Sequence, residues 1–315
     1  MKKISILLCL WVMIIVLTAC QAETTKATKV LVPFGAPAFA QVSMEYQLSQ
    51  VDDPDFEIEI VYGADNLAAA FNSESHEIIY APSNLGARLI KSAQVPYQYL
   101  ATISRGNLYL ATKDTTLDEN TLNGREIIAF GENATPGIVL ETIINEMALE
   151  NTPTIRYVDS VNTAAAYLAE DNSRIVLLAE PILSVQAMQL DGLSTLDLQA
   201  KWSEYFKSDA YPQAGVFVHE DLAQRRIDLF ESLLKDSINK ANTAPQDVAN
   251  DAVNLGYELP EAVLKEAIPR SNLSYIPSDD AKASMELYFE KILNLNPNLI
   301  GGGLPDDYFY KHLSP

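Results

Sequence analysis

Cysteine is scarce in this sequence of 315 residues, and both examples lie near its start. Only Cys9 and Cys20 occur. The rest of the chain can form no internal disulfide, so its fold must be stabilised by a hydrophobic core. About 300 residues are enough for such a core, and more naturally as two domains than as one.

Several catalytic motifs are also missing. The chain contains no Gly-x-Ser-x-Gly elbow, no His-Glu-x-x-His helix, no phosphate-binding P-loop and no Gly-x-Gly-x-x-Gly turn. Its three histidines, His76, His219 and His312, share no metal-ligand spacing. We therefore expect no enzymatic activity, no metal site and no cofactor.

Positive charge is in short supply. The chain has 22 lysines and arginines against 42 aspartates and glutamates, which gives a net charge of −20 at pH 7. Such a surface repels the phosphates of nucleic acids. A nucleic-acid partner is not expected.

Long apolar runs are absent after the first twenty residues. The chain opens with Met1-Lys2-Lys3 and is then apolar from Ile4 to Leu17. A short basic start followed by an apolar segment of this length is typical of a secretory signal peptide. The segment is too short to span a membrane comfortably, since a span needs roughly 20 apolar residues. We predict a signal peptide over residues 1–19.

The end of this segment, Leu17-Thr18-Ala19-Cys20, resembles the lipobox of bacterial lipoproteins. The resemblance implies that Cys20 carries acyl chains of the palmitate type and anchors the protein to the outer face of the cytoplasmic membrane. The alternative is an ordinary cleaved signal peptide with a chance cysteine. Residues 20–28 are small and polar, which predicts a flexible tether after the lipidated residue.

Beyond the tether, short β-type runs alternate with helical segments. This alternation is typical of an α/β fold with mostly parallel sheets flanked by helices. After Asp221 the pattern predicts a largely helical tail. The predicted strands are 29–34, 57–62, 77–81, 97–104, 108–112, 126–130, 154–158, 174–179 and 215–219.

Two breaks in the pattern predict a division into two lobes. Arg105-Gly106-Asn107 separates two strand-like runs, and Tyr211-Pro212 interrupts a helix-rich stretch before the next strand. The simplest arrangement has residues 29–107 and 213–315 in lobe 1 and residues 108–212 in lobe 2. Two chain crossings between lobes form a hinge that permits closure around a ligand.

Candidate ligand contacts follow the strands, because ligands of open α/β sheets bind beyond the carboxyl ends of strands and near helix N-termini. The same residue types also suit helix caps and first helical turns, so plain helix capping is the competing interpretation. The candidates are Gly35, Ala36, Pro37, Ser83, Asn84, Thr135, Pro136 and Glu180, with Asn107 added from the first crossing.

With these motifs in order, the chain resembles the type II periplasmic-binding-protein fold of ABC-transporter receptors. The similarity is greatest to the nitrate/sulfonate/taurine/thiamine-precursor branch and covers nearly all of the chain after the signal peptide. It rests on short motifs in a fixed order: Gly35-Ala36-Pro37, Ala81-Pro82-Ser83-Asn84, Gly106-Asn107-Leu108-Tyr109-Leu110, Ala134-Thr135-Pro136, Ala179-Glu180-Pro181 and the terminal stretch from Leu304 to Tyr310. The resemblance implies that the loops after the strands bind a ligand and that the lobes close over it.

Glu180 leaves two interpretations open for the choice of ligand. A carboxylate in the site repels a bare oxyanion and suits a ligand with N–H donors, such as a nitrogen heterocycle. Alternatively, Glu180 only stabilises the N-terminus of its own helix. Arg88 and Arg105 lie near the predicted loops with no defined direction, and Tyr80, Tyr97 and Tyr109 are candidates for stacking or for the core.

These observations predict a lipid-anchored, extracytoplasmic and monomeric solute-binding protein. It would deliver a small polar organic ligand, either a nitrogen heterocycle or a small organic anion, to an ABC permease and its ATPase. One alternative is an enzyme of the same fold that acts on a small aromatic or pyrimidine-like metabolite, although such enzymes work in the cytoplasm. Another is a lipoprotein sensor or adhesin.

Overall fold

The computed structural model describes residues 26–52 and 54–312. The predicted signal peptide, Cys20 and most of the tether lie outside these residues. Within the described ranges, no helix is both long and apolar enough to cross a membrane.

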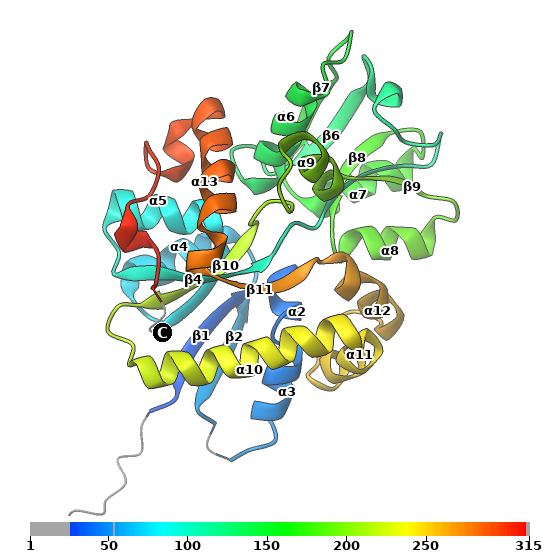
Figure 1. The fold of residues 1–315 in the computed structure, drawn as a ribbon. Coiled ribbons are helices and arrows are strands. Elements are labelled where there is room, and N and C mark those ends of the chain that lie inside the picture. The colour runs from blue at the N-terminus through cyan, green and yellow to red at the C-terminus, as the bar shows by residue number, and fades with distance from the viewer. Residues whose placement is uncertain (1–25, 53, 313–315) are drawn as a thin grey trace, which may run out of the picture.

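The first sheet has six strands and lies in lobe 1 (Figure 1). It pairs strands from both ends of the chain, and β10 and β11 run opposite to their neighbours, so β1 to β4 share one direction. In the order β11-β4-β10-β3-β1-β2, the strands are Leu273–Pro277, Tyr97–Ser104, Ala214–His219, Ile78–Pro82, Thr28–Pro33 and Phe56–Val61.

Helices cover both faces of this sheet. One face packs against α4 (Ala64–Ser73), α5 (Ser83–Ala93) and α13 (Ser278–Leu295). Because neither face meets water, consecutive residues of β1 are apolar, and Val30, Leu31 and Val32 are all buried. The other face packs against α2 (Ala36–Phe39), α3 (Val42–Leu48), α10 (Gln224–Thr243), α11 (Pro245–Asn254) and α12 (Glu261–Arg270).

The second sheet forms lobe 2 and has five strands, of which only β5 opposes the common direction. In the order β7-β6-β8-β5-β9, the strands are Thr154–Val158, Glu126–Phe130, Ile175–Ala179, Leu108–Thr112 and Ser194–Asp197. Two helices cover each face: α6 (Thr135–Glu146) and α9 (Leu198–Phe206) on one, α7 (Val161–Glu170) and α8 (Ile182–Gln189) on the other.

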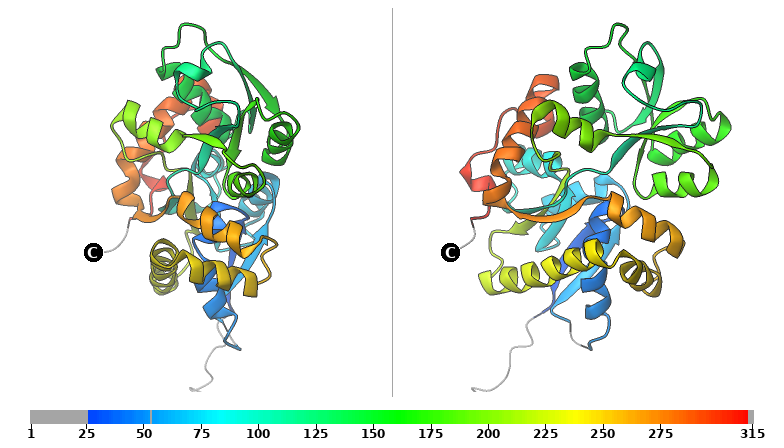
Figure 2. Two further views of the ribbon diagram at one scale, coloured as in Figure 1. Left: turned by 90° about the vertical axis from the view of Figure 1, so that its right-hand side faces the viewer. Right: turned by 45° about the vertical axis from the view of Figure 1, so that its right-hand side comes forward.

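One hydrophobic core runs through both lobes. Helix α13 of lobe 1 stands beside lobe 2 in both sets of views (Figures 1 and 2), and its Tyr288 ring lies 5.8 Å from the ring of Trp202 in α9. Tyr211, on the second crossing, stacks on Tyr288 at 6.0 Å. On the same helix, Lys291 lies 4.0 Å from the centre of the Phe206 ring. The lobes are therefore joined by apolar packing along α13 as well as by the two crossings.

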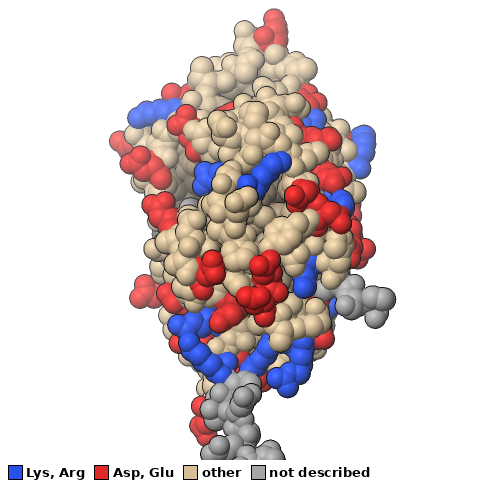
Figure 3. Space-filling view, turned by 90° about the vertical axis from the view of Figure 1, so that its left-hand side faces the viewer, with Lys and Arg blue, Asp and Glu red and all other residues tan. Residues whose placement is uncertain are grey.

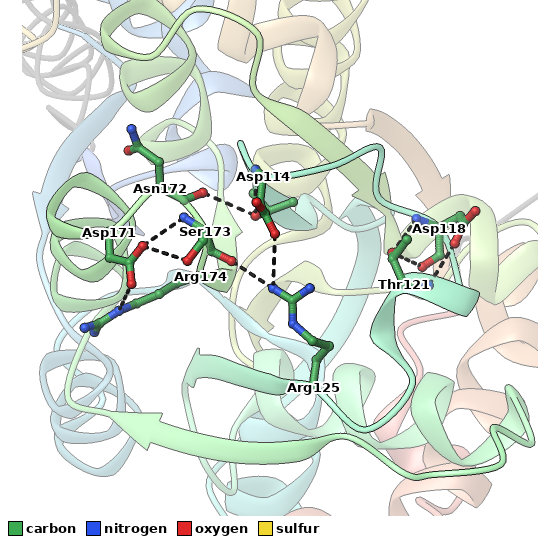
Figure 4. A network of polar contacts seen from close by, with 9 residues as sticks. Asp114, Asp118, Thr121, Arg125, Asp171, Asn172, Ser173 and Arg174 are labelled. Carbon is green, nitrogen blue, oxygen red and sulfur yellow. Dashed lines mark hydrogen bonds and ion pairs between the residues drawn. The ribbon is translucent and has the colours of Figure 1, made fainter.

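The edge of the second sheet that points away from lobe 1 is tied by polar contacts (Figure 4). Arg125 donates to the Ser173 carbonyl at 2.9 Å and lies 3.8 Å from the Asp114 carboxylate. Asp171 accepts from both the backbone and the hydroxyl of Ser173. Partly exposed ion pairs of this kind are worth roughly 0.2–1 kcal/mol each. At this edge Arg125 pairs with Asp114, and Arg174 pairs with Asp171.

Acidic and basic side chains intermingle on the face of the molecule shown in Figure 3, with several basic ones together toward its lower end. The excess of carboxylates therefore forms no single acidic field on that face.

The structure confirms the predicted α/β class and the two lobes. The strands of lobe 1 come from residues 28–104 and 214–277, and those of lobe 2 from residues 108–197. Sequence analysis missed β9 and α9, because it took the region before Tyr211 as one helix-rich stretch. It also missed β11, which pairs with β4 inside the predicted helical tail.

Gly215 of β10 provides a test of the packing in lobe 1. A Cβ atom at this position would lie 2.2 Å from Cε2 of Tyr99 and 2.6 Å from the carbonyl oxygen of Ala101. Since backbone cannot move aside cheaply, Gly215→Ala should lower the free energy of unfolding by about 1–3 kcal/mol. In the matched control Gly303→Ala, the added atom would meet only the flexible end of Lys91 at 3.0 Å. Equal denaturation midpoints for the two variants would contradict this packing.

Candidate ligand-binding site

Each sheet has a point where the strand order reverses. β1 lies between β2 and β3 in lobe 1, and β6 lies between β7 and β8 in lobe 2. Ligands of open α/β sheets bind at such switch points, beyond the carboxyl ends of the strands. The residues that follow β1, β3, β6 and β8 include all the candidates except Asn107.

Asn84 and Thr135 join the two lobes directly. The hydroxyl of Thr135 in α6 donates to Oδ1 of Asn84 in α5 at 3.0 Å, and Tyr288 of α13 donates to the same hydroxyl at 3.5 Å. Both Asn84 and Thr135 are buried, at 6% and 4% exposure. Two helix N-termini, one from each lobe, therefore meet through side chains.

The capping interpretation is wrong for these helices. The residue preceding α5 is Pro82 and the one preceding α6 is Ala134, and neither helix has a side-chain cap. The hydroxyl of Ser83 is fully buried next to the Tyr99 hydroxyl of β4, inside lobe 1. The side chains of Asn84 and Thr135 bond to each other across the lobes instead of capping their own helices.

A chain of hydrogen bonds connects the two crossings to the candidate residues. Gln213 on the second crossing donates to Oδ1 of Asn107 at 2.7 Å and accepts from the Asn107 backbone at 3.0 Å. The Gln213 carbonyl accepts from the Ser83 backbone at 3.1 Å, and the Asn107 amide donates to the Glu180 carbonyl at 3.3 Å. Ser83 of lobe 1 and Glu180 of lobe 2 are therefore positioned through the same pair of residues.

The two oxygens of Glu180 have different environments. Oε2 accepts from the Ser184 backbone at 3.1 Å, in the first turn of α8, as the helix-stabilising interpretation predicts. Oε1 has no hydrogen-bond partner among the described residues and lies 3.8 Å from Nη1 of Arg270, at the end of α12 in lobe 1. The Glu180 side chain is fully buried, whereas that of Arg270 is 42% exposed. One oxygen serves the helix, and the other faces the opposite lobe.

Burial raises the pKa of Glu180 from 4.5 to about 7. Loss of water around the carboxylate is the largest cause, and the hydrogen bonds from Ser184 and the charge of Arg270 oppose it. A carboxyl group with a pKa near neutrality at a junction between lobes is typical of functional sites.

The loop after β1 has room for a ligand beside its backbone. Gly35 is buried and has a φ of +116°, yet an added Cβ atom would have no neighbour within 4 Å. Phe34 stacks on Tyr62, which follows β2, at a ring distance of 5.0 Å, and Tyr62 is 65% exposed. This aromatic pair offers a flat apolar surface at the carboxyl edge of the first sheet.

The structure brings Ser83, Asn84, Asn107, Thr135 and Glu180 together, and their role as ligand contacts stays a prediction. Gly35, Ala36 and Pro37 lie at the same edge of the sheet but make no hydrogen bond to those five within the described part of the chain. Pro136 occupies the first turn of α6 behind Thr135.

Sequence analysis missed Arg270, Gln213, Tyr288 and the Phe34–Tyr62 pair. The only available signal was an aromatic residue directly after each of the first two strands. Of the earlier candidates, Tyr80 and Tyr97 are fully buried in the core, and Tyr109 donates to the Arg270 carbonyl at 3.0 Å. Arg88 is exposed on α5, and Arg105 lies 3.7 Å from the Asp209 carboxylate.

Metal ligands do not cluster in the part of the chain that the structure describes: no group of three His, Cys, Asp or Glu residues there could hold a metal ion. The residues at the lobe junction supply hydrogen-bonding groups and an ion pair, and the Phe34–Tyr62 pair supplies an aromatic surface at the edge of the first sheet.

The fold is shared with solved structures of an ABC transporter protein and of periplasmic binding proteins. An ABC transporter protein from Parabacteroides distasonis is 21% identical, with a TM-score of 0.81 over 92% of this chain and 100% of that one. The periplasmic aliphatic sulphonate-binding protein SsuA from Escherichia coli is 14% identical, with a TM-score of 0.65 over 92% and 96%. The periplasmic nitrate-binding protein NrtA from Synechocystis is 10% identical, with a TM-score of 0.62 over 86% and 82%.

The sequence matches no protein-family model and no curated protein. At these identities the structural similarity defines the class of fold: a two-lobe periplasmic-binding-protein fold of the kind found in the nitrate and sulphonate branch.

Glu180 should make the stability of the protein depend on pH. Between about pH 4.5 and 7 the folded carboxyl binds a proton that the unfolded chain releases, so the free energy of unfolding falls as pH rises through this window. Glu180→Gln should remove this pH-dependent fall in the free energy of unfolding, because the amide side chain has the shape of the carboxyl group but carries no charge. At pH 8 the variant should be more stable than the native protein by up to about 3 kcal/mol, and near pH 4.5 the two should be equal.

Urea unfolding at the two pH values measures this difference. The matched control is Glu170→Gln, which removes one carboxylate whose side chain is 70% exposed on α7. A native protein that matches Glu180→Gln in stability at pH 8 would contradict the buried carboxyl.

Proposed function

We propose that this protein is an extracytoplasmic solute-binding protein that captures a small polar organic ligand between its lobes and delivers it to an ABC importer. The observation that carries this proposal is the direct contact of α5 and α6 across the lobes, through Asn84 and Thr135. The buried Glu180 Oε1, which has no hydrogen-bond partner among the described residues, lies beside the same junction. Such atoms are costly unless a ligand or water satisfies them.

Lobe closure is the mechanism that this geometry supports. The two crossings and α13 hold the lobes together, while the junction itself is made of polar side chains that a ligand can contact from both lobes. A ligand that contacts both lobes stabilises the closed form by its differential affinity for that form, and no covalent step is required. The importer can then distinguish the loaded protein by its closed shape.

The partners follow from the same proposal. They are a small-molecule ligand, an ABC permease and its ATPase. The chain would act as a monomer on the outer face of the cytoplasmic membrane, held by lipid on Cys20 after removal of residues 1–19. Labelling of cells with a radioactive fatty acid, followed by recovery of the native chain and of Cys20→Ala, tests the anchor. Equal labelling of the two would contradict it.

Intrinsic fluorescence tests ligand binding. Trp202 is one of two tryptophans in the chain, is 1% exposed, and packs between the lobes against Tyr211 and Tyr288. A screen of small polar compounds should give a saturable change in its emission for one chemical class. Conversion of a bound compound to a product by the purified protein would favour the alternative that the protein is an enzyme of the same fold.

Asn84 and Thr135 should contribute to affinity as a pair. Because their side chains bond to each other in the closed protein, Asn84→Ala and Thr135→Ala should each weaken binding of a compound found in the screen by roughly 5- to 20-fold. The double variant should lose less than the product of the two factors, since a single contact is removed twice. Circular dichroism should show unchanged secondary structure, and a double variant with native affinity would show that the junction is not the site.

A further inference from the structure

Glu180 is the most unusual group at the lobe junction. Its side chain is fully buried, yet Oε1 has no hydrogen-bond partner among residues 26–52 and 54–312. The hydroxyl of Ser184, in the first turn of α8, is buried beside the same carboxyl group and acts on its pKa. One oxygen of a fully buried carboxyl group therefore lacks the partner that buried groups normally have.

Arg270 does not supply that partner. Its Nη1 atom is 3.8 Å from Oε1, beyond hydrogen-bonding distance, and the guanidinium side chain is 42% exposed. The Tyr109 hydroxyl is directed to the Arg270 carbonyl and not to the carboxylate. Oε1 therefore faces Arg270 of lobe 1 without a hydrogen bond from it.

The charges around Glu180 are unfavourable for an anion. Arg270 is the cation that acts on this carboxyl, and the Glu266 carboxylate, also on α12, acts on it with the opposite sign. Arg105, the other arginine near the crossings, lies 3.7 Å from the Asp209 carboxylate. An oxyanion at Oε1 would meet a carboxylate at close range, and among the described residues Arg270 is the one, partly hydrated cation that offsets the repulsion.

On the basis of the proposed binding function, the geometry points to a ligand that donates N–H groups to Glu180 Oε1 and the Ser184 hydroxyl. Suitable groups are an amidinium, a protonated amine or an amino group on a heterocycle. This assignment separates the chain from the sulphonate- and nitrate-binding proteins that share its fold.

Such a ligand also explains how the buried carboxyl is tolerated. In the bound state the N–H groups replace the water that Glu180 loses on closure, and a charge-assisted hydrogen bond forms in a low-dielectric site. Because the donor favours the ionised carboxyl, binding below neutral pH should release a proton from Glu180.

Matched probes test the assignment. Benzamidinium and 4-aminopyrimidine carry N–H donors, whereas benzoate, ethanesulfonate and nitrate carry only acceptors. Titration of the full protein, followed by Trp202 emission and by calorimetry, should show saturable binding of at least one donor probe and none of the acceptors at equal concentrations. At pH 6, calorimetry in two buffers of different ionisation enthalpy should show proton release with the donor probe.

Variants of Glu180 and Ser184 test whether the donor probe binds at this carboxyl group. Glu180→Gln should weaken the donor probe by roughly 10- to 100-fold and abolish proton release, and Ser184→Ala should weaken it by roughly 3- to 10-fold. Glu170→Gln, which removes a carboxylate from the exposed side of the same lobe, should bind as the native protein does.

Results that would contradict the ligand class differ from results that would contradict the solute-binding function. Saturable binding of ethanesulfonate or nitrate, or unchanged donor affinity in Glu180→Gln, would overturn the ligand class and leave the solute-binding function standing. Absence of binding by every probe in both classes would overturn the ligand class, and a broader screen that also found no closing ligand would remove the proposed function itself.

Discussion

Two sheets that present the carboxyl ends of their strands to one junction are the constraint on which the rest of this structure depends. The pair Asn107 and Gln213 holds that geometry, because each lies on one chain crossing and the two exchange a pair of hydrogen bonds. Through the same residues the backbone of Ser83 and the carbonyl of Glu180 are fixed relative to each other. The positions of the candidate residues therefore follow from the crossings and not from any single loop.

The two edges of lobe 2 contrast in a way that supports this account. At the edge away from lobe 1, Arg125 and Asp171 satisfy their polar groups with near neighbours. At the junction, one oxygen of Glu180 has no hydrogen-bond partner in the part of the chain that the structure describes. Stability alone favours the first arrangement, because an unsatisfied buried group costs free energy. An unsatisfied carboxylate oxygen at the junction lowers the stability of the protein locally, and functional sites retain groups of this kind.

Most of the fold could be predicted from the sequence because the strands are strongly apolar and regularly spaced. Elements with a weak pattern could not: β9 is a four-residue strand, and β11 lies among helices. The site was only partly predictable. Strand ends and turns indicated Ser83, Thr135 and Glu180, but the same residue types also suit helix caps. Whether a side chain caps its own helix or points elsewhere depends on the folded structure.

Arg270 illustrates why the remainder was beyond sequence analysis. Arg270 is the last residue of α12 and lies 90 residues after Glu180 in the sequence, so no local motif connects the two. The contact exists because α12 packs against α8 across the lobes. Likewise, the pKa of Glu180 depends on burial between elements that the sequence places far apart.

The distance between the lobes is the most direct test of closure. Spin labels at Asn72→Cys on α4 and Asp191→Cys after α8, both exposed, report on lobe 1 and lobe 2 in a chain whose native cysteines are replaced by serine. Double electron–electron resonance should give a broad or longer distribution of distances between the labels without ligand. With a saturating compound it should give one narrow distribution at a shorter distance. Identical distributions in the two states would contradict a junction that opens and closes.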